Sequence, residues 1–288
     1  MSVLFDGLSL GAIYAMIALG YTMVYGIAKM LNFAHGDIIM VGAYAIYTTM
    51  VFWGKGLWVA VIGAAVLCTL MGILMEKLAY KPLRGASPLA VLITAIGVSY
   101  LLQSLAQLIF GVTPRPVNLG SFGSVEILGA SIPVSTVLTL VIGAVLMAGL
   151  TLFVNKTNTG RAMQAVSEDR GAAQLMGVNV NFIIMITFAI GSALAAAASV
   201  FYLMQIPLVE PLLGSMPGIK AFTAAVIGGI GSIPGAMIGG VMLGVIEKIC
   251  LSIDAIKDYT TAIEFGLLIL ILLVRPIGLL GKKRREKV

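Results

Sequence analysis

The chain has 288 residues, of which 60% are hydrophobic and only 10% are charged, and its mean hydropathy is +1.07. This composition excludes an ordinary soluble globular protein and indicates an integral membrane protein. The formal net charge of +6 does not indicate a nucleic-acid partner, because the basic residues are spread over the connections and gathered in the final GKKRREKV.

About nine apolar segments follow one another along the chain. They cover residues 3–27, 38–52, 57–75, 88–110, 133–154, 182–204, 219–230, 234–251 and 260–280. A bilayer core about 30 Å thick needs about 20 apolar residues of helix, and the backbone polar groups must be paired within each segment. We therefore predict an all-α fold, a polytopic transmembrane helical bundle of about 8–9 segments with short broken or re-entrant helices.

Two of these segments need separate interpretation. Segment 3–27 lacks a basic n-region and a small-residue cleavage site, so we expect it to remain as a span and not to be removed as a signal peptide. Segment 219–230 would be only about 18 Å long as a helix, which favours a half-helix or a re-entrant element.

Basic residues occur in alternate connections between the segments. They are Lys29, then Lys77, Lys81 and Arg84, then Lys156, Arg161 and Arg170, and finally Arg275 with the terminal tail. The positive-inside rule assigns these connections to the cytoplasm. We predict one transmembrane domain over residues 1–288, with a cytoplasmic region 155–181, an external loop 111–132 and a cytoplasmic C-terminus. Nine crossings would leave the N-terminus outside, whereas eight crossings with one re-entrant segment would leave it inside.

The most polar internal stretch is GRAMQAVSEDRGAAQLMGVNV, in the predicted cytoplasmic region. Thr159 is placed to cap a short helix over 160–166, Ser167 to cap a second over 168–176, and Gly177 to end it. The predicted apolar faces consist of Ala162, Ala165 and Val166, and of Ala172, Leu175 and Met176. Such helices suit a groove on a partner protein, or they rest at the lipid interface.

Glycine and proline are concentrated in VIGGIGSIPGAMIGGVMLG, where Pro234 favours a helix start and the preceding glycines favour a helix end. The segment LNFAHGDIIMVGAY has a weaker, similar pattern. Ends of broken helices can line a translocation path in transporters. We predict that the path lies near these two segments, with hydroxyls such as those of Thr223 and Ser232 facing a polar substrate. The predicted path residues are Asn32, His35, Gly36, Asp37, Thr223, Gly229, Gly231, Ser232 and Pro234.

Several polar residues lie inside apolar segments. His35 with Asp37 allows a proton relay or a structural role at a helix start, and we favour the structural role. Unpaired charges at bilayer depth cost several kcal/mol. Glu247 and Glu264 are therefore expected to face inward and to pair, with Lys248 or Lys220 as candidate cations.

Gln103 and Gln107 lie four residues apart on one predicted helix. This spacing places them on one face, where they line a polar seam or bond across helices, and we favour the second interpretation.

The sequence predicts no catalytic, cofactor or metal site. It has no GxxxxGK[ST] phosphate loop, no paired carboxylates, no Ser/His/Asp set and no metal-ligand spacing. Cys68 and Cys250 stand alone in apolar runs, which is typical of small buried residues. These features argue against an enzyme and indicate that any ATP hydrolysis belongs to another chain.

Three separated blocks carry a family resemblance: ALGYTMVYGIAKMLNFAHGDIIMVGAY, AVSEDRGAAQLMGVN and KAFTAAVIGGIGSIPGAMIGGVMLG. Together they resemble the permeases of branched-chain amino acid ABC importers, the prokaryotic uptake systems for leucine, isoleucine and valine. The resemblance implies a multi-pass protein of the cell inner membrane. It also implies as partners a homologous second permease subunit, two ATP-binding cassette subunits and an external substrate-binding protein.

The stretch GAAQLMG resembles the Ala-Ala-x-x-x-Gly signature with which ABC importer permeases contact their ATPases, although Gly171 stands where the signature has Glu. The resemblance therefore implies that this stretch couples the chain to the ATPases. The candidate coupling residues are Arg161, Glu168, Asp169, Arg170, Ala172, Ala173 and Gly177.

The sequence thus predicts a subunit that forms half of a translocation path for branched-chain amino acids and performs no chemistry itself. An ion-coupled secondary transporter or channel is the main alternative, suggested by Asp37, Glu264 and the abundant glycines. Permeases for urea, short amides or other amino acids are alternatives within the importer class, and a membrane enzyme ranks third.

Overall fold

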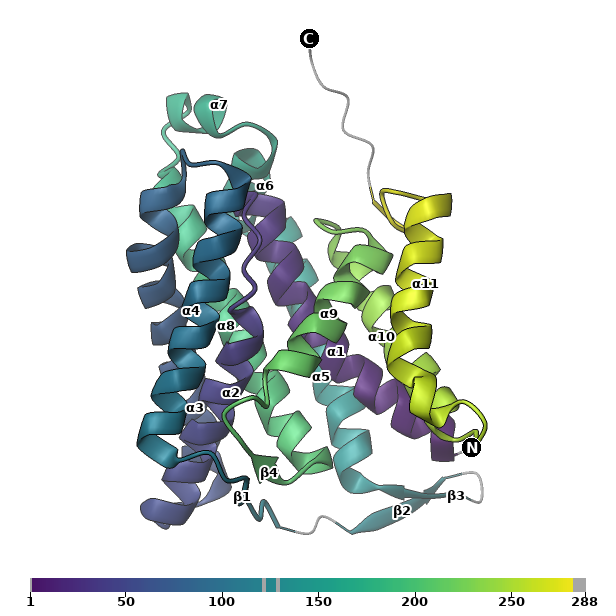
Figure 1. Ribbon diagram of the computed structural model, residues 1–288. Helices are drawn as coiled ribbons and strands as arrows, with labels where there is room; N and C mark the ends of the chain where they lie inside the picture. The colour runs from purple at the N-terminus through teal and green to yellow at the C-terminus, as the bar shows by residue number, and fades with distance from the viewer. Residues whose placement is uncertain (1, 121–122, 128–129, 282–288) are drawn as a thin grey trace.

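The computed structural model describes residues 2–120, 123–127 and 130–281, which form a helical bundle with short strands at one end (Figure 1). Within these described residues, six stretches of helix are long and apolar enough to cross a membrane. They are α1 (Ser2–Ala28), α3 (Leu57–Met75) with its continuation to Leu83, α4 (Pro88–Phe110), α5 (Val134–Lys156), α8 (Val180–Gln205) and α10 (Ile233–Leu251).

Shorter elements complete the described fold. The helices are α2 (His35–Tyr47), which continues into a π-helical turn Thr48–Phe52, α6 (Asn158–Glu168), α7 (Arg170–Leu175), α9 (Ser215–Gly228) and α11 (Thr260–Val274). The strands form two antiparallel pairs: β1 (Arg115–Pro116) with β4 (Leu208–Val209), and β2 (Ser124–Ile127) with β3 (Ala130–Pro133).

Each predicted apolar segment falls on a helix, so the all-α prediction is confirmed. Segment 219–230 is part of the 14-residue helix α9, and segment 260–280 is helical only as far as Val274. The segment 111–132, predicted as an external loop, contains β1, β2 and the start of β3, which the sequence analysis did not predict. These strands are too short and too rich in turn residues to produce a strand pattern in the sequence.

The bundle has two distinct ends (Figure 1). Helices α6 and α7 lie at one end, which we name the α7 end, and the paired strands lie at the other, the strand end. The N-terminus lies at the strand end, whereas α11 finishes towards the α7 end. Between α1 and α2, residues 29–34 run back from the α7 end into the bundle, so α2 begins inside it.

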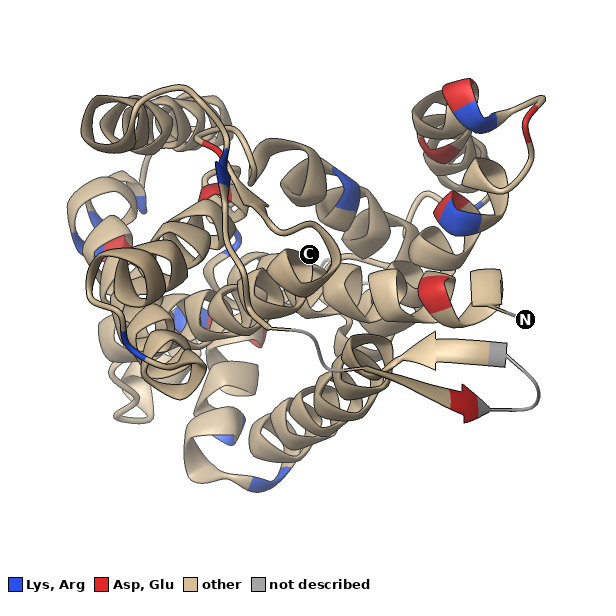
Figure 2. Ribbon diagram, turned by 90° about the horizontal axis from the view of Figure 1, so that it is seen from below, with Lys and Arg blue, Asp and Glu red and all other residues tan. Residues whose placement is uncertain are grey.

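The charges divide between the two ends. Along the helices, charged residues appear as scattered bands on largely uncharged ribbons (Figure 2). The connections and helix termini at the α7 end carry mostly basic residues: Lys29, Lys77, Lys81, Arg84, Lys156, Arg161, Arg170 and Arg275, with the acidic Glu76, Glu168 and Asp169. At the strand end the charges nearly balance, with the acidic Asp6, Glu126, Glu210, Asp254 and Asp258 and the basic Lys55, Arg115, Lys248 and Lys257.

Small residues bring α1 and α10 into backbone contact. A Cβ atom added to Gly244 would lie 2.2 Å from the Gly11 nitrogen, and one added to Gly240 would lie 2.4 Å from the Ala15 nitrogen. On each helix these residues are four apart, which is the spacing that allows helices to approach closely in membranes. The contact places α1 in the core, where residues from Leu10 to Val24 are buried.

The turn between α9 and α10 is completed by residues that follow α11. Gly229 and Gly231 adopt φ angles of 107° and 93°, which glycine tolerates and other residues disfavour. The Leu279 and Leu280 N–H groups donate to the carbonyls of Ile227 and Gly228, each at 2.9 Å. The last carbonyls of α9 are thereby paired by a segment about 50 residues further along the chain.

The start of α10 agrees with the sequence prediction. The Ser232 hydroxyl accepts a hydrogen bond from the Gly235 N–H at 3.3 Å, and Pro234 lies in the first helical turn. Proline suits this position because the first N–H groups of a helix have no intrahelical partner.

Candidate functional site

Helices α6 and α7 form a hairpin at the α7 end. The Thr157 hydroxyl accepts from the Gly160 N–H and caps α6, and the Asp169 carboxylate accepts from the Ala172 N–H and caps α7, each at 3.0 Å. The predicted caps, Thr159 and Ser167, were wrong because both residues are already inside α6. Gly177 follows the end of α7 with a φ of 84°, as expected for a residue that ends a helix.

The hairpin buries one set of apolar side chains and exposes another. Met163 and Val166 of α6 and Ala173 of α7 are buried. The predicted α6 face was wrong in part, because Ala165 is exposed and Met163 takes its place. In contrast, Leu175 and Met176 are 90% and 84% exposed. We name these two residues, with the exposed Ala172, the α7 tip; it is an exposed apolar surface at the α7 end, where the charged residues are mostly basic.

The charged candidate coupling residues lie in different environments. Arg161 is exposed and donates to the Asn158 side chain of its own helix at 2.9 Å. Glu168 and Asp169 are exposed. Arg170 is half-buried and donates to the Ala28 carbonyl at the end of α1. Burial and the nearby Arg84 guanidinium lower the pKa of Arg170.

The first group of predicted path residues lies where α2 begins. The Asn32 side-chain oxygen accepts from the Tyr80 hydroxyl at 2.7 Å. His35 is 1% exposed, and its ring packs edge-on against Tyr21 with 4.9 Å between centroids. A Cβ added to Gly36 would lie 2.6 Å from the Gly214 carbonyl oxygen, so only glycine permits this contact between the starts of α2 and α9.

The Gln103 amide joins Asp37 of α2, its own helix α4 and Ser215 of α9 through hydrogen bonds. The Asp37 carboxylate accepts from Gln103 Nε2 of α4 at 2.9 Å, and the same nitrogen lies 3.3 Å from the Ser215 hydroxyl oxygen of α9. No hydrogen bond joins His35 and Asp37 within the described residues, and this favours the structural role over a proton relay. The prediction of a bond across helices is confirmed for Gln103, whereas Gln107 is exposed and makes none of the described side-chain bonds.

Gln103→Leu is expected to lower the free energy of unfolding by about 1–3 kcal/mol, because the buried Asp37 carboxylate loses the Gln103 amide as a hydrogen-bond donor. Gln107→Leu is the matched control, since it changes the same side chain one turn further along an exposed face. Thermal unfolding of the two purified variants in one detergent measures the difference. Equal unfolding midpoints would contradict this role for Gln103.

The second group of predicted path residues lies at the other end of α9. Thr223 is buried in α9, and Gly229, Gly231, Ser232 and Pro234 form the α9–α10 turn described above. Helix α9 has 14 residues. It separates this turn from the Asp37, Gln103 and Ser215 side chains, which we name the Asp37 cluster. The structure therefore does not bring the nine predicted residues into one site, because a helix of that length separates its two ends by about 20 Å.

A buried ionic cluster joins four helices. The Lys220 ammonium of α9 lies 2.7 Å from Glu247 Oε1 of α10 and 3.2 Å from Glu264 Oε2 of α11. The Tyr14 hydroxyl of α1 donates to the second oxygen of Glu247 at 2.7 Å. The prediction that both glutamates face inward and pair is confirmed, and of the two candidate cations the structure selects Lys220. Tyr14 was missed, because nothing in its apolar surroundings distinguishes it from a packing residue.

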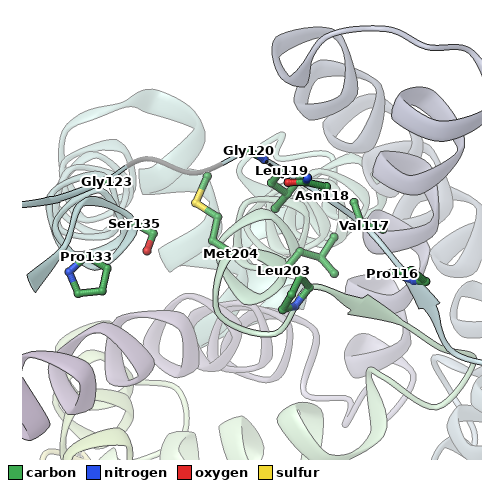
Figure 3. Close-up of a pocket in the computed structure, with 11 residues that line it drawn as sticks. Pro116, Val117, Asn118, Leu119, Gly120, Gly123, Pro133, Ser135, Leu203 and Met204 are labelled. Carbon is green, nitrogen blue, oxygen red and sulfur yellow. Dashed lines mark hydrogen bonds between the residues drawn. The ribbon is translucent and has the colours of Figure 1, made fainter.

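A cavity of about 570 Å³ opens at the strand end (Figure 3). The 117–120 segment, the start of α5 and the end of α8 supply its walls. Apolar side chains dominate the lining, with Asn118 and Ser135 as polar members beside Val117, Leu119, Leu203 and Met204. No local sequence pattern predicts this cavity, since its walls come from three distant parts of the chain.

Cys68 and Cys250 are free and buried. Within the described residues, no group of three His, Cys, Asp or Glu side chains is arranged to hold a metal ion.

Comparison with known proteins shows extensive similarity. A family described as "Branched-chain amino acid transport system / permease component" matches residues 3–272. The chain is 44% identical to the high-affinity branched-chain amino acid transport system permease protein BraD of Pseudomonas aeruginosa, covering 99% of this chain and 97% of that protein. It is 42% identical to LivH of Escherichia coli, covering 99% and 96%. LivM of Escherichia coli, named as a permease protein of the same kind of system, is 26% identical over 98% of this chain and 71% of LivM.

Proposed function

Because the chain belongs to the family of branched-chain amino acid transport permease components, we propose that it forms half of the translocation path of an ATP-driven importer. Separate ATP-binding cassette subunits supply the energy. The observation that supports this most directly is the α7 tip, where Leu175 and Met176 are almost fully exposed. The tip belongs to a capped hairpin outside the long helices. Such a surface suits a groove on a partner protein.

The distribution of charge supports an orientation for the subunit. The α7 end carries the excess of Lys and Arg, and the positive-inside rule assigns such an end to the cytoplasm. The α7 tip then faces the ATPases, the C-terminus is cytoplasmic and the N-terminus is external. The protein resides in the inner membrane and passes through it several times.

The partners follow from the same proposal. Two ATP-binding cassette subunits dock on the cytoplasmic face, one of them at the α7 tip. A second, homologous permease completes the path, which agrees with the similarity of this chain to both LivH and LivM. An external substrate-binding protein delivers a branched-chain amino acid to the strand end. The subunit itself acts as a permease and not as an enzyme.

In the proposed mechanism, closure of the ATPases moves α7 and changes access to the path. Movement reaches α8 directly, because Gly177 and the capping residue Asn179 connect α7 to it. The path passes near the starts of α2 and α9, where the chain reverses inside the bundle. The packing of His35 on Gly20, with no room for a Cβ atom between them, supports a conformation in which this route is closed.

Leu175→Asp is expected to reduce ATPase-subunit binding and ATP-driven leucine uptake by about thirtyfold, the size of an interface hot spot. Gln174→Asp is the control, since it places the same charge at the adjacent exposed position. The measurements are copurification of the ATPase subunits and uptake into vesicles containing the complete complex.

Two results would contradict the proposal. One is full copurification and uptake by the Leu175→Asp variant. The other is uptake by this chain alone under a proton gradient, which would identify an ion-coupled transporter.

A further inference from the structure

We infer that Arg170 is a positioning residue that ties the ATPase-docking helix α7 to the end of α1 and, through it, to the start of α2. The inference rests on the proposed function and deepens it. In this arrangement Arg170 does not contact the ATPase; it carries the movement of α7 to a part of the bundle that the chain reaches 142 residues earlier.

The contact is formed by a charged donor and a helix terminus. Arg170 is the first residue of α7, and its Nη2 donates to the carbonyl oxygen of Ala28, the last residue of α1. The carbonyls of a last helical turn have no partner within the helix and carry partial negative charge, so a guanidinium is a favourable partner. Ala28 is fully buried, whereas Arg170 is half-buried and reaches inward to it.

The end of α1 controls how the chain enters the bundle. Lys29 follows with a φ of 53°, and among the described residues it is the only non-glycine with a positive value. Its N–H donates to the Tyr25 carbonyl at 3.0 Å, which fixes the reversal. The chain then passes to Asn32, whose carbonyl accepts from the His35 N–H at 3.1 Å as α2 begins. A displacement of Ala28 is therefore passed over a few residues to the Asp37 cluster.

A second set of contacts joins residues 29–34 and the start of α8 to the residues that follow α3. Arg84 pairs with Glu76 and donates to the side-chain oxygen of Asn181, near the start of α8. The Tyr80 hydroxyl, from the same part of the chain as Glu76, donates a hydrogen bond to the side-chain oxygen of Asn32. These bonds attach residues 29–34 and α8 to the end of α3, but they do not include α7. Among the described side-chain hydrogen bonds and ion pairs, the Arg170 contact is the one that joins α7 to α1.

Arg161 offers a matched comparison. It is also an arginine of the hairpin, but it is exposed and its described side-chain bond is to Asn158 of the same helix. Neutralising Arg161 therefore removes an equal charge from the cytoplasmic face without releasing a contact between α7 and the bundle.

The test uses the complete complex in vesicles, with its ATPase subunits, second permease and binding protein, and compares Arg170→Met, Arg170→Gln and Arg161→Met. Copurification of the ATPase subunits, the rate of ATP hydrolysis and the rate of leucine uptake are measured. With Arg170→Met we expect copurification and hydrolysis to persist, while leucine imported per ATP falls about tenfold, as for the loss of one hydrogen bond from a charged donor. Arg161→Met removes the same charge but no contact between α7 and α1, so its ratio should stay above that of Arg170→Met, and equal ratios in these two variants would overturn the inference.

An unchanged ratio in both Arg170 variants would overturn the inference, and so would loss of ATPase copurification in these variants, because Arg170 would then be a docking residue. If Arg170→Met does not accumulate, the ratio in Arg170→Gln decides, since the shorter neutral side chain also cannot make the charged bond. Failure of the proposed function would show in the wild-type complex and not only in the variants. In that case the wild-type complex would not retain the ATPase subunits, or it would import leucine without ATP.

Discussion

Lys220→Met is expected to lower the free energy of unfolding by about 3–5 kcal/mol, the cost of removing one partner from a buried ion pair. Lys220 is the cation that lies between Glu247 and Glu264, and all three residues are buried. Without it, two carboxylates face each other in a region with little water. The helices α9, α10 and α11 would then lose the interaction that they share.

Thermal or denaturant unfolding of the purified subunit measures this effect. Lys248→Met is the control, because Lys248 follows Glu247 on the same helix but lies outside the cluster. The triple change Lys220→Met, Glu247→Gln and Glu264→Gln should recover most of the lost stability, because it removes all three charges while keeping similar side-chain volumes. If the Lys220→Met variant unfolds at the same midpoint as the wild-type protein, the cluster does not stabilise the fold.

Gly240→Val is expected to prevent accumulation of the folded subunit, because the added side chain would meet the backbone of Ala15 and force α1 away from α10. Overpacking of this kind costs about 3 kcal/mol or more when neither side is a flexible side chain. The position of α1 in the core leaves no direction in which it can shift without disturbing α8 or α9.

Gly97→Val is the matched control. Gly97 is also inside a long helix, α4, but a Cβ atom there would meet nothing within 4 Å. Abundance in the membrane fraction and the elution profile in detergent distinguish the two variants. If the Gly240 variant accumulates and elutes like the Gly97 variant, the close α1–α10 contact is not required for folding.

The order and approximate ends of the helices were predictable from the sequence, because hydropathy and glycine or proline positions depend on nearby residues. The cap positions in the cytoplasmic hairpin were not. Thr157 and Thr159 are equally good caps by residue type, as are Ser167 and Asp169. The choice depends on which register buries Met163 and Val166, and this packing is a tertiary property that local preferences do not contain.

The candidate site was predictable in part for a similar reason. The rule that buried charges must pair was sufficient to predict that Glu247 and Glu264 are paired, but it left Lys220 and Lys248 open as the cation. It did not indicate that Tyr14 completes the cluster, or that Arg170 reaches Ala28, since both contacts join residues far apart in the sequence. The predicted path residues were grouped by two similar motifs, and the length of α9 separates those motifs in space.

The backbone bonds from Leu279 and Leu280 to the end of α9 have a consequence for biosynthesis. A ribosome translates α1 to α11 before these two donors exist, so the α9–α10 turn remains unfinished until Leu279 and Leu280 follow the described helices. A chain that stops after Val274 would contain all the described helices and still leave the Ile227 and Gly228 carbonyls without these partners. Such a truncated product would be recognisable to membrane proteases by an internal defect, far along the chain from the cut end.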